Sequence, residues 1–218
     1  MGKPAHPKVY SKNQIKKIKE TGQLVNEVLS LMASQCEVGK STYELDQLAK
    51  RFLEFKNATS ASFNYNGFPG YSCISVDEVI LHGVPSKDKI LSEGMIVNLD
   101  CPVKYKGMFA DAAINVKIGE VDEEKEKLNQ TTFQCLMETL NMMGPGVTIG
   151  EVCKFQEDYA KKHGYKVVKT FQGHGIGRNL HEAPPVPYFF NKKNPYNDYK
   201  LKVGNVLAIE PTLVTNDD

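Results

Sequence analysis

Apolar residues recur at helical spacing in the first part of the chain. In residues 11–35 they stand three or four positions apart, which places them on one face of an amphipathic helix; they are Ile15, Ile18, Leu24, Val25, Val28, Leu29 and Met32. Ser41 and Glu44 then form a Ser-x-x-Glu capping box, whose side chains satisfy backbone N–H groups at a helix start. We therefore predict a second helix, with apolar positions Leu45, Leu48, Ala49 and Phe52.

Three stretches after this helix have the pattern of strands. They are residues 73–81, 95–103 and 108–118. The short polar stretch 104–107 separates the last two strands, so we predict a hairpin with Tyr105 and Lys106 at its tip.

The same order of elements then occurs a second time. Residues 122–143 have helical spacing, and Thr148 and Glu151 form a second capping box 107 residues after the first. We predict an α+β fold with an internal duplication: a tail at 1–10, then one domain at 11–218 with halves at about 11–118 and 119–218. Such a duplication places the functional site where the halves meet.

Composition narrows the class of protein. The chain has 218 residues, 41% apolar and 24% charged, with a formal net charge of +1, which gives no argument for nucleic acid or an anionic membrane as partner. Five cysteines without a C-x-x-C pair favour reduced thiols in the cytoplasm. No apolar run is long enough to span a membrane, and the first residues lack the apolar core of a signal peptide.

Two carboxylates flank the predicted hairpin. With its tip at residues 105 and 106, Asp100 pairs with Asp111, and their Cβ atoms lie about 4.5–5.5 Å apart. Two carboxylates this close, among Val, Leu and Phe, repel each other and are poorly hydrated. A shared proton, a cationic side chain or a metal ion would each resolve the repulsion, and exposure on a polar strand face would avoid it.

Three histidines and one glutamate lie in unusual surroundings. His174 lies between Gly173 and Gly175, His181 follows seven residues later, and His82 ends a predicted apolar strand. The glycines do not have the spacing of a dinucleotide-binding loop. Glu210 follows four apolar residues, where a carboxylate is costly unless it is paired, bound to a metal or reaches solvent.

Taken together, these residues resemble the methionine aminopeptidases, and the short segment from His181 to Glu210 resembles the type I enzymes. The resemblance runs from about residue 11 to the end. Its motifs are NGFPGYSCISVDEVILHGVP, the sequence VNLD with a second Asp eleven residues on, GHGIGRNLHEAP and IEP.

The resemblance implies a role for each residue. Asp100 binds one metal ion, Asp111 bridges two, and His174 and Glu210 bind the other. Glu210 also transfers a proton from the metal-bound water to the leaving amine. His82 and His181 stand outside the metal shell and hydrogen-bond the scissile amide or its tetrahedral intermediate. Three residues line the methionine side-chain pocket: Tyr65, Phe68 and Cys73.

The resemblance also implies the fold, the cofactors and the partners. The fold is the pita-bread fold, a curved antiparallel sheet with paired helices in pseudo-twofold halves. Oxygen ligands with one imidazole suit two divalent ions of Co, Mn, Fe or Zn, which activate a bridging water. The expected substrates are peptides and nascent chains with an N-terminal methionine. The ribosome is a candidate partner, and the protein is expected to be a cytoplasmic monomer.

The sequence departs from the family at three places. The family has a further bridging glutamate on a last strand, whereas this sequence stops eight residues after Glu210, and Asp217 and Asp218 are too close to replace it. We therefore expect a truncated C-terminal strand, or a weak or mononuclear site if the chain is whole. Ser62 and Leu180 stand where Cys and an aromatic residue are common, which affects the pocket and not the chemistry.

Three other functions fit parts of the sequence. An Xaa-Pro aminopeptidase would have the same fold but usually an additional N-terminal domain. A metal-free pita-bread protein could bind other proteins, although such relatives typically lose the ligands that are present here. In a plain α+β domain with scattered acidic residues, these residues would not bind a metal.

Overall fold

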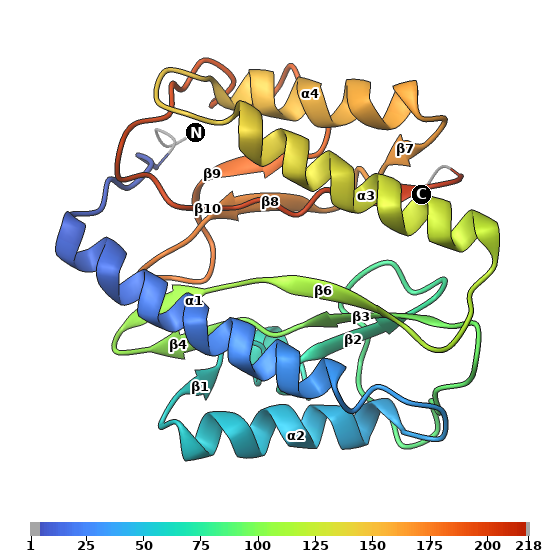
Figure 1. The fold of residues 1–218 in the computed structure, drawn as a ribbon. Coiled ribbons are helices and arrows are strands. Elements are labelled where there is room, and N and C mark those ends of the chain that lie inside the picture. Colours follow the sequence, from blue (N-terminus) through green and yellow to red (C-terminus); the bar gives the residue numbers. More distant parts are fainter. Residues whose placement is uncertain (1–4, 217–218) are drawn as a thin grey trace. The chain divides into compact units, whose positions relative to one another are not determined.

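The computed structural model describes residues 5–216, which fold as two compact units. The first unit comprises residues 13–125 and 178–180. Its strands form two antiparallel sheets, ordered β1-β4-β5 and β2-β3-β6. In chain order its elements are α1 (Lys12–Ala33), α2 (Thr42–Phe55), β1 (Thr59–Ser60), η1 (Tyr65–Gly67), β2 (Cys73–Val76), β3 (Ile96–Asp100), β4 (Val103–Tyr105), β5 (Met108–Ala110) and β6 (Ala113–Lys117) (Figure 1).

The second unit comprises residues 5–12, 126–177 and 181–216. Its strands form the sheets β10-β8-β9 and β11-β7, which are also antiparallel. Its elements are α3 (Glu123–Met142), which begins at the end of the first unit, α4 (Ile149–Lys162), β7 (Lys166–Val167), β8 (Gln172–Gly175), β9 (Glu182–Pro187), β10 (Leu207–Ala208) and β11 (Leu213–Val214). Asp217 and Asp218, like the first four residues of the predicted tail, lie outside the described residues.

Both predicted capping boxes are present. The Ser41 hydroxyl accepts a hydrogen bond from the Glu44 amide at 3.2 Å, and the Ser41 amide donates to the Glu44 carboxylate at 2.9 Å. Thr148 and Glu151 repeat this arrangement at 3.2 and 2.7 Å. The two boxes fix where α2 and α4 begin, as the sequence predicts.

The duplication extends to backbone contacts around the two boxes. Gly39 and Gly146, each two residues before a capping residue, both have a positive φ, of 90° and 98°. The amide of Gly39 donates to the carbonyl of Leu91 at 2.9 Å, and the amide of Gly146 donates to that of Leu201 at 2.9 Å. In each unit, a glycine turn of the same kind therefore precedes the capped helix and is hydrogen-bonded to a later segment of the chain.

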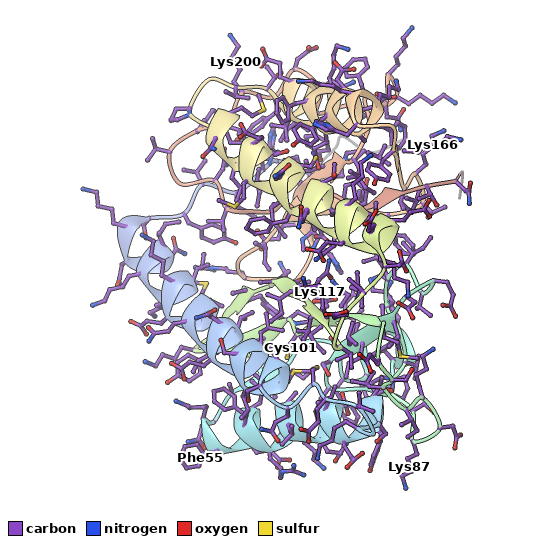
Figure 2. All side chains as sticks on the ribbon, turned by 45° about the vertical axis from the view of Figure 1, so that its right-hand side comes forward. Phe55, Lys87, Cys101, Lys117, Lys166 and Lys200 are labelled. Atoms are coloured by element: carbon purple, nitrogen blue, oxygen red, sulfur yellow. The ribbon has the colours of Figure 1, made fainter. Side chains whose placement is uncertain are left out.

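The core of the first unit lies between its two helices and one face of the sheet β2-β3-β6. On β3, Val97 and Leu99 are fully buried in that core. Asp100 is next to Leu99 in the strand, so its side chain lies on the opposite face of the sheet. Cys101 lies among the core side chains, and Phe55 points outward from the end of α2 (Figure 2). The helices pack on the apolar face of the sheet, and polar side chains, including Asp100, lie on the other face.

All five cysteines lie within the described part of the chain and are free thiols, as predicted. Across residues 5–216, no helix has the length and apolar composition that a membrane crossing requires.

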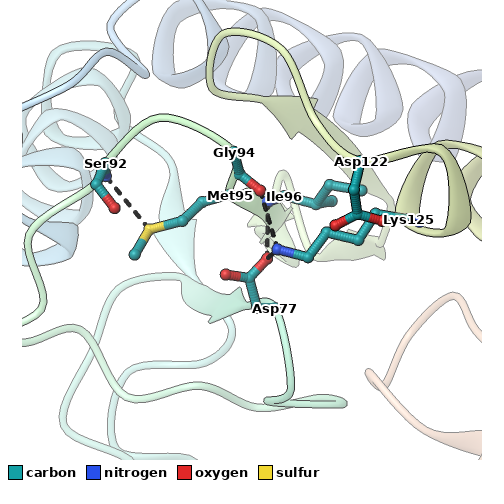
Figure 3. A network of polar contacts seen from close by, with 7 residues as sticks. All are labelled: Asp77, Ser92, Gly94, Met95, Ile96, Asp122 and Lys125. Atoms are coloured by element: carbon teal, nitrogen blue, oxygen red, sulfur yellow. Dashed lines mark hydrogen bonds and ion pairs between the residues drawn. The ribbon is translucent and has the colours of Figure 1, made fainter.

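The predicted strand at 73–81 ends early, at Val76. The next residue, Asp77, has a φ of 51° and turns the chain out of the sheet. Its amide donates to the carbonyl of Ile96, and its carboxylate accepts from the Ile96 amide, both at 3.0 Å. Lys125 donates to this carboxylate and to the carbonyl of Gly94, both at 2.9 Å (Figure 3). This network closes the loop that follows β2 and fixes the start of α3.

Replacing Lys125 by methionine is expected to lower the free energy of unfolding by about 1 kcal/mol, because two charge-assisted hydrogen bonds of a partly exposed ammonium are lost. Chemical denaturation would measure the change. Lys127→Met, two residues along the same helix, is the matched control and should change stability by less than about 0.5 kcal/mol. Equal effects of the two substitutions would contradict a specific role for Lys125.

Candidate metal site

The predicted pairing of Asp100 with Asp111 is wrong in register. The hairpin pairs Tyr105 with Met108, and its tip is Lys106 and Gly107, both with positive φ (48° and 76°). Positive φ at both central residues is the geometry of a tight hairpin turn, and it favours a glycine within the turn. The shift places Ala113, two residues beyond Asp111, opposite Asp100.

The two aspartates nevertheless lie together. The predicted strand 108–118 is interrupted between β5 and β6, and Asp111 lies in that interruption, diagonally across from Asp100. Their carboxyl groups share a hydrogen bond. Burial raises the pKa of Asp111 to about 6, against the opposing effect of that hydrogen bond. A hydrogen bond between two carboxyl groups needs a proton, so the metal-free pair shares one below about pH 6, and a bound cation could take its place.

Cys73 lies directly beside this pair. It is opposite Asp100 in the β2–β3 ladder and is buried. Burial, and then the charge of Asp100, raises the pKa of the Cys73 thiol. Cys73 is therefore a neutral, apolar neighbour of the carboxylates rather than a thiolate ligand.

His174 and Glu210 form the second pair. His174 lies on β8 and is buried, and its Nδ1 is 2.9 Å from the carbonyl oxygen of Gly175. A carbonyl oxygen only accepts, so Nδ1 carries a proton, and in the neutral form of the ring Nε2 presents a lone pair. Nε2 lies 3.5 Å from Oε1 of Glu210, which follows β10.

This geometry fits a metal ligand pair. Two acceptor atoms 3.5 Å apart are favourable only with a proton or a cation between them. A first-row metal bound at about 2.0–2.2 Å by a histidine nitrogen and a carboxylate oxygen would bring the two atoms slightly closer. The backbone hydrogen bond at Nδ1 is the outer contact that commonly orients a ligating imidazole.

His181 lies against His174, with ring centroids 4.2 Å apart in an edge-to-face arrangement. The next residue, Glu182, accepts a hydrogen bond at 2.7 Å from the hydroxyl of Tyr10, a contact that the sequence did not predict. Tyr10 is buried, and its amide donates to the carbonyl of Gly204 at 2.7 Å. Tyr10 thus supports the segment that carries His181.

The prediction that His82 ends a strand is wrong. β2 has ended six residues earlier, and His82 has a φ of 56°. The following residue, Gly83, holds it near β2, because the Gly83 amide donates to Ser75 Oγ at 3.0 Å and its carbonyl accepts from Ile74 at 2.9 Å. Partial loss of hydration lowers the pKa of His82, which favours the neutral ring.

The predicted pocket residues are all in the first unit. Tyr65 begins the short helix η1 and is exposed, Phe68 follows η1 and is half-buried, and Cys73 begins β2. The structure therefore brings Cys73 together with the aspartates, and His181 together with His174 and Glu210. Within residues 5–216, no group of three or more His, Cys, Asp and Glu side chains is already arranged to hold a metal ion. The candidate ligands come as pairs.

The glycines around His174 are needed for close packing of the backbone. A Cβ on Gly173 would lie 2.5 Å from the carbonyl oxygen of Ala208, and one on Gly175 would lie 2.5 Å from that of Ala183. Neither glycine has a positive φ. The glycines thus let β8 approach β9 and β10, which places His174 beside the segment that leads to Glu210.

Gly173→Ala is accordingly expected to lower the free energy of unfolding by about 1–3 kcal/mol, because the new methyl group displaces backbone. Thermal and chemical denaturation would measure the loss. Gly144→Ala is the matched control, since a Cβ there meets nothing within 4 Å. A Gly173→Ala variant as stable as Gly144→Ala would contradict the packing argument.

The fold and these ligand types define the class of metal-dependent peptidases. The chain belongs to metallopeptidase family M24, whose model matches residues 16–218.

Among its relatives, the methionine aminopeptidase of Aquifex aeolicus is 35% identical, over 94% of this chain and 81% of the relative. The crystal structure of the methionine aminopeptidase from Thermotoga maritima has a TM-score of 0.92 at 30% identity and covers 97% of this chain and 84% of that one. The Xaa-Pro dipeptidase from Bacillus anthracis is more distant, with a TM-score of 0.80 at 25% identity. This match covers 93% of the present chain and 54% of the dipeptidase chain.

These comparisons confirm the resemblance to methionine aminopeptidases, the pita-bread fold and the hydrolase class. They also imply the use of a divalent metal. The Xaa-Pro enzymes share the fold but are less similar in sequence, so that alternative is the weaker one.

Proposed function

We propose that this protein is a methionyl aminopeptidase, which hydrolytically removes the N-terminal methionine from peptides and nascent chains. The observation that carries the proposal is the combination of family and ligands. The chain matches proteins named methionine aminopeptidase over nearly its whole length, and it keeps two pairs of side chains suited to a divalent metal. Residues 11–218 act as one catalytic domain in this proposal, in a cytoplasmic monomer.

We assign four ligands for divalent metal: Asp100 and Asp111 in the first unit, and His174 and Glu210 in the second. The expected content is two divalent ions of Co, Mn, Fe or Zn. When bound, such ions polarise a peptide carbonyl and lower the pKa of a bound water. The outer hydrogen bond of His174 fixes the tautomer of the neutral ring, in which Nε2 presents its lone pair to the metal.

The other residues act on the substrate. Glu210 moves a proton from the attacking water to the leaving amine. His82 and His181 donate hydrogen bonds to the scissile amide and to the negative charge that develops on it. Tyr65, Phe68 and Cys73 line an apolar pocket for the unbranched thioether. The ribosome, where nascent chains emerge, remains a candidate partner.

Cleavage of two peptides by the purified, metal-loaded protein tests the proposal. Release of methionine from Met-Ala-Ser, lost with a chelator and restored by Mn or Co, is the expected result. Cleavage of an Xaa-Pro peptide in preference would favour the prolidase-like alternative. No transition metal above background and no activity after adding Mn or Co would favour a metal-free binding protein.

A further inference from the structure

Asp46 is a buried carboxylate that the proposed chemistry does not use. It lies on the apolar face of α2 among Leu45, Ala49 and Leu53, and only 2% of its surface is exposed. Burial raises its pKa, against the effect of its hydrogen bonds. A carboxylate is costly at such a position unless its partners are worth the loss of hydration.

Its partners belong to the segment that enters β2. A single oxygen, Oδ1, accepts three hydrogen bonds: from the amide of Tyr71 at 2.7 Å, the amide of Ser72 at 2.8 Å and the hydroxyl of Ser72 at 3.0 Å. The other oxygen accepts from Gln47 at 3.2 Å. Asp46 thus fixes two successive residues directly before Cys73.

The anchored residues in turn hold the beginning of the same segment. The Ser60 hydroxyl donates to the carbonyl of Tyr71 at 2.7 Å and accepts from the amides of Ser62 and Phe63 at 3.1 Å. The rings of Phe63 and Tyr71 stack with centroids 4.4 Å apart. Residues 60–63 and 71–72 are therefore clamped together, and the η1 turn with Tyr65 and Phe68 is the loop that this clamp closes.

The second unit offers an internal comparison. Aligned on the capping boxes, Asp46 corresponds to Cys153 of α4, which is fully buried and carries no charge. The link from α2 to β2 is residues 56–72, whereas the link from α4 to β8 is residues 163–171, eight residues shorter. In α4, where the following link is short, this helix position is occupied by the small apolar residue Cys153. The carboxylate occurs only in the unit with the longer link.

We propose that Asp46 is a positioning residue for substrate selection: it anchors residues 60–72 so that Tyr65, Phe68 and Cys73 present a preformed pocket to the side chain of the N-terminal residue. The inference rests on the proposed function, since it concerns that pocket. The hydrogen bonds of Asp46 go to Gln47, Tyr71 and Ser72, none of which is a candidate ligand or pocket residue. Its effect passes through the backbone of Tyr71 and Ser72, so its loss should loosen the pocket wall and leave the metal ligands in place.

Two substitutions separate the anchor from general stability. Asp46→Cys introduces the residue found at the equivalent position of α4, and Asp46→Asn keeps an acceptor oxygen at Oδ1. Leu53→Ala, in the same helix, removes core packing but none of the hydrogen bonds that Asp46 makes, and serves as the matched control for lost stability. All variants are compared as metal-loaded full chains at a temperature where each is folded by circular dichroism.

For Asp46→Cys we expect KM for Met-Ala-Ser to rise about tenfold with kcat changed less than about threefold. The preference for Met-Ala-Ser over Leu-Ala-Ser should fall about tenfold, since pockets discriminate between similar apolar side chains through their shape. Asp46→Asn should restore most of the preference, and Leu53→Ala should keep it. Hydrogen exchange should show faster exchange at residues 60–73 in Asp46→Cys and not in Leu53→Ala.

Different results overturn the two proposals. A wild-type protein that does not release methionine from Met-Ala-Ser overturns the proposed function, and this inference with it. A wild-type protein that does so, together with an Asp46→Cys variant of unchanged preference or unchanged exchange at residues 60–73, overturns the role of Asp46 alone. Equal loss of preference in Leu53→Ala would likewise assign the effect to stability.

Discussion

Replacing Asp111 by asparagine is expected to stabilise the metal-free protein at pH 7.5 while removing its metal-dependent activity. Asparagine has the same size and keeps one acceptor oxygen, but it carries no charge. The unfavourable ionisation of a buried carboxyl group is therefore removed, and the free energy of unfolding should rise by about 1–2 kcal/mol. Loss of a metal ligand should lower kcat/KM by at least about 1,000-fold, because several kcal/mol of charge stabilisation go with it.

The free energy of unfolding of the metal-free protein should depend on pH, in a direction set by the raised pKa of Asp111. The pKa of Asp111 is about 6 in the folded protein and 3.8 as its ordinary value. Between these values the folded state binds more protons than the unfolded state, so the free energy of unfolding falls as pH rises through this window. Wild-type protein in chelator should accordingly lose stability from pH 4 to pH 6, and Asp111→Asn should lose less.

Denaturation in chelator at several pH values, with metal analysis of the loaded proteins, would measure both effects. Asp88→Asn, an exposed aspartate outside the candidate site, is the control and should leave stability, metal content and activity unchanged. An Asp111→Asn protein that is less stable than the wild type without metal, or that binds metal as the wild type does, would contradict the assignment.

The elements that the sequence predicts well are those with local signals. The starts of α2 and α4 follow from capping boxes whose partners lie three residues apart, and the helices predicted at 11–35 and 122–143 agree with α1 and α3 to within two residues at each end. Strand ends were predicted less well, because they depend on single backbone conformations. Asp77 ends β2 with a positive φ that its type permits but does not require.

The register of the hairpin shows how a small error acts on a site prediction. Placing the tip one residue too early put Asp111 opposite Asp100, whereas the ladder puts Ala113 there. Gly107 was the available signal, since a positive φ within the turn suits glycine. The pair survived the error because diagonal neighbours on a sheet also come within reach of each other.

Asp46 could not be assigned from the sequence, although a charged residue on the apolar face of a predicted helix was visible. Its partners are backbone amides 25 and 26 residues further along the chain, and no spacing rule connects them. Tyr10 and Glu182 are an extreme case, because 172 residues separate them. Residues that support a site through tertiary contacts need the fold before they can be recognised.

Substitution of His174 and of His181 should separate two roles that the sequence motif joins. The two rings are only 4.2 Å apart, so they share their surroundings. His174 is buried, with its tautomer fixed by Gly175 and its Nε2 directed at Glu210, whereas His181 is exposed. We therefore expect His174→Ala to lose both metal and activity, and His181→Ala to keep the metal while kcat falls about 100–1,000-fold, the effect of losing one hydrogen bond to developing charge.

Metal content after dialysis and the kinetics of Met-Ala-Ser cleavage would measure the two effects, and each variant serves as the control for the other. His174→Ala should also lose the increase in melting temperature that added Mn gives the wild type, because a ligand that binds only the folded state stabilises it. His181→Ala should retain that increase. If both variants lost the metal to the same extent, His181 would be a ligand; if both kept it, the pair of His174 and Glu210 would not be part of the metal site.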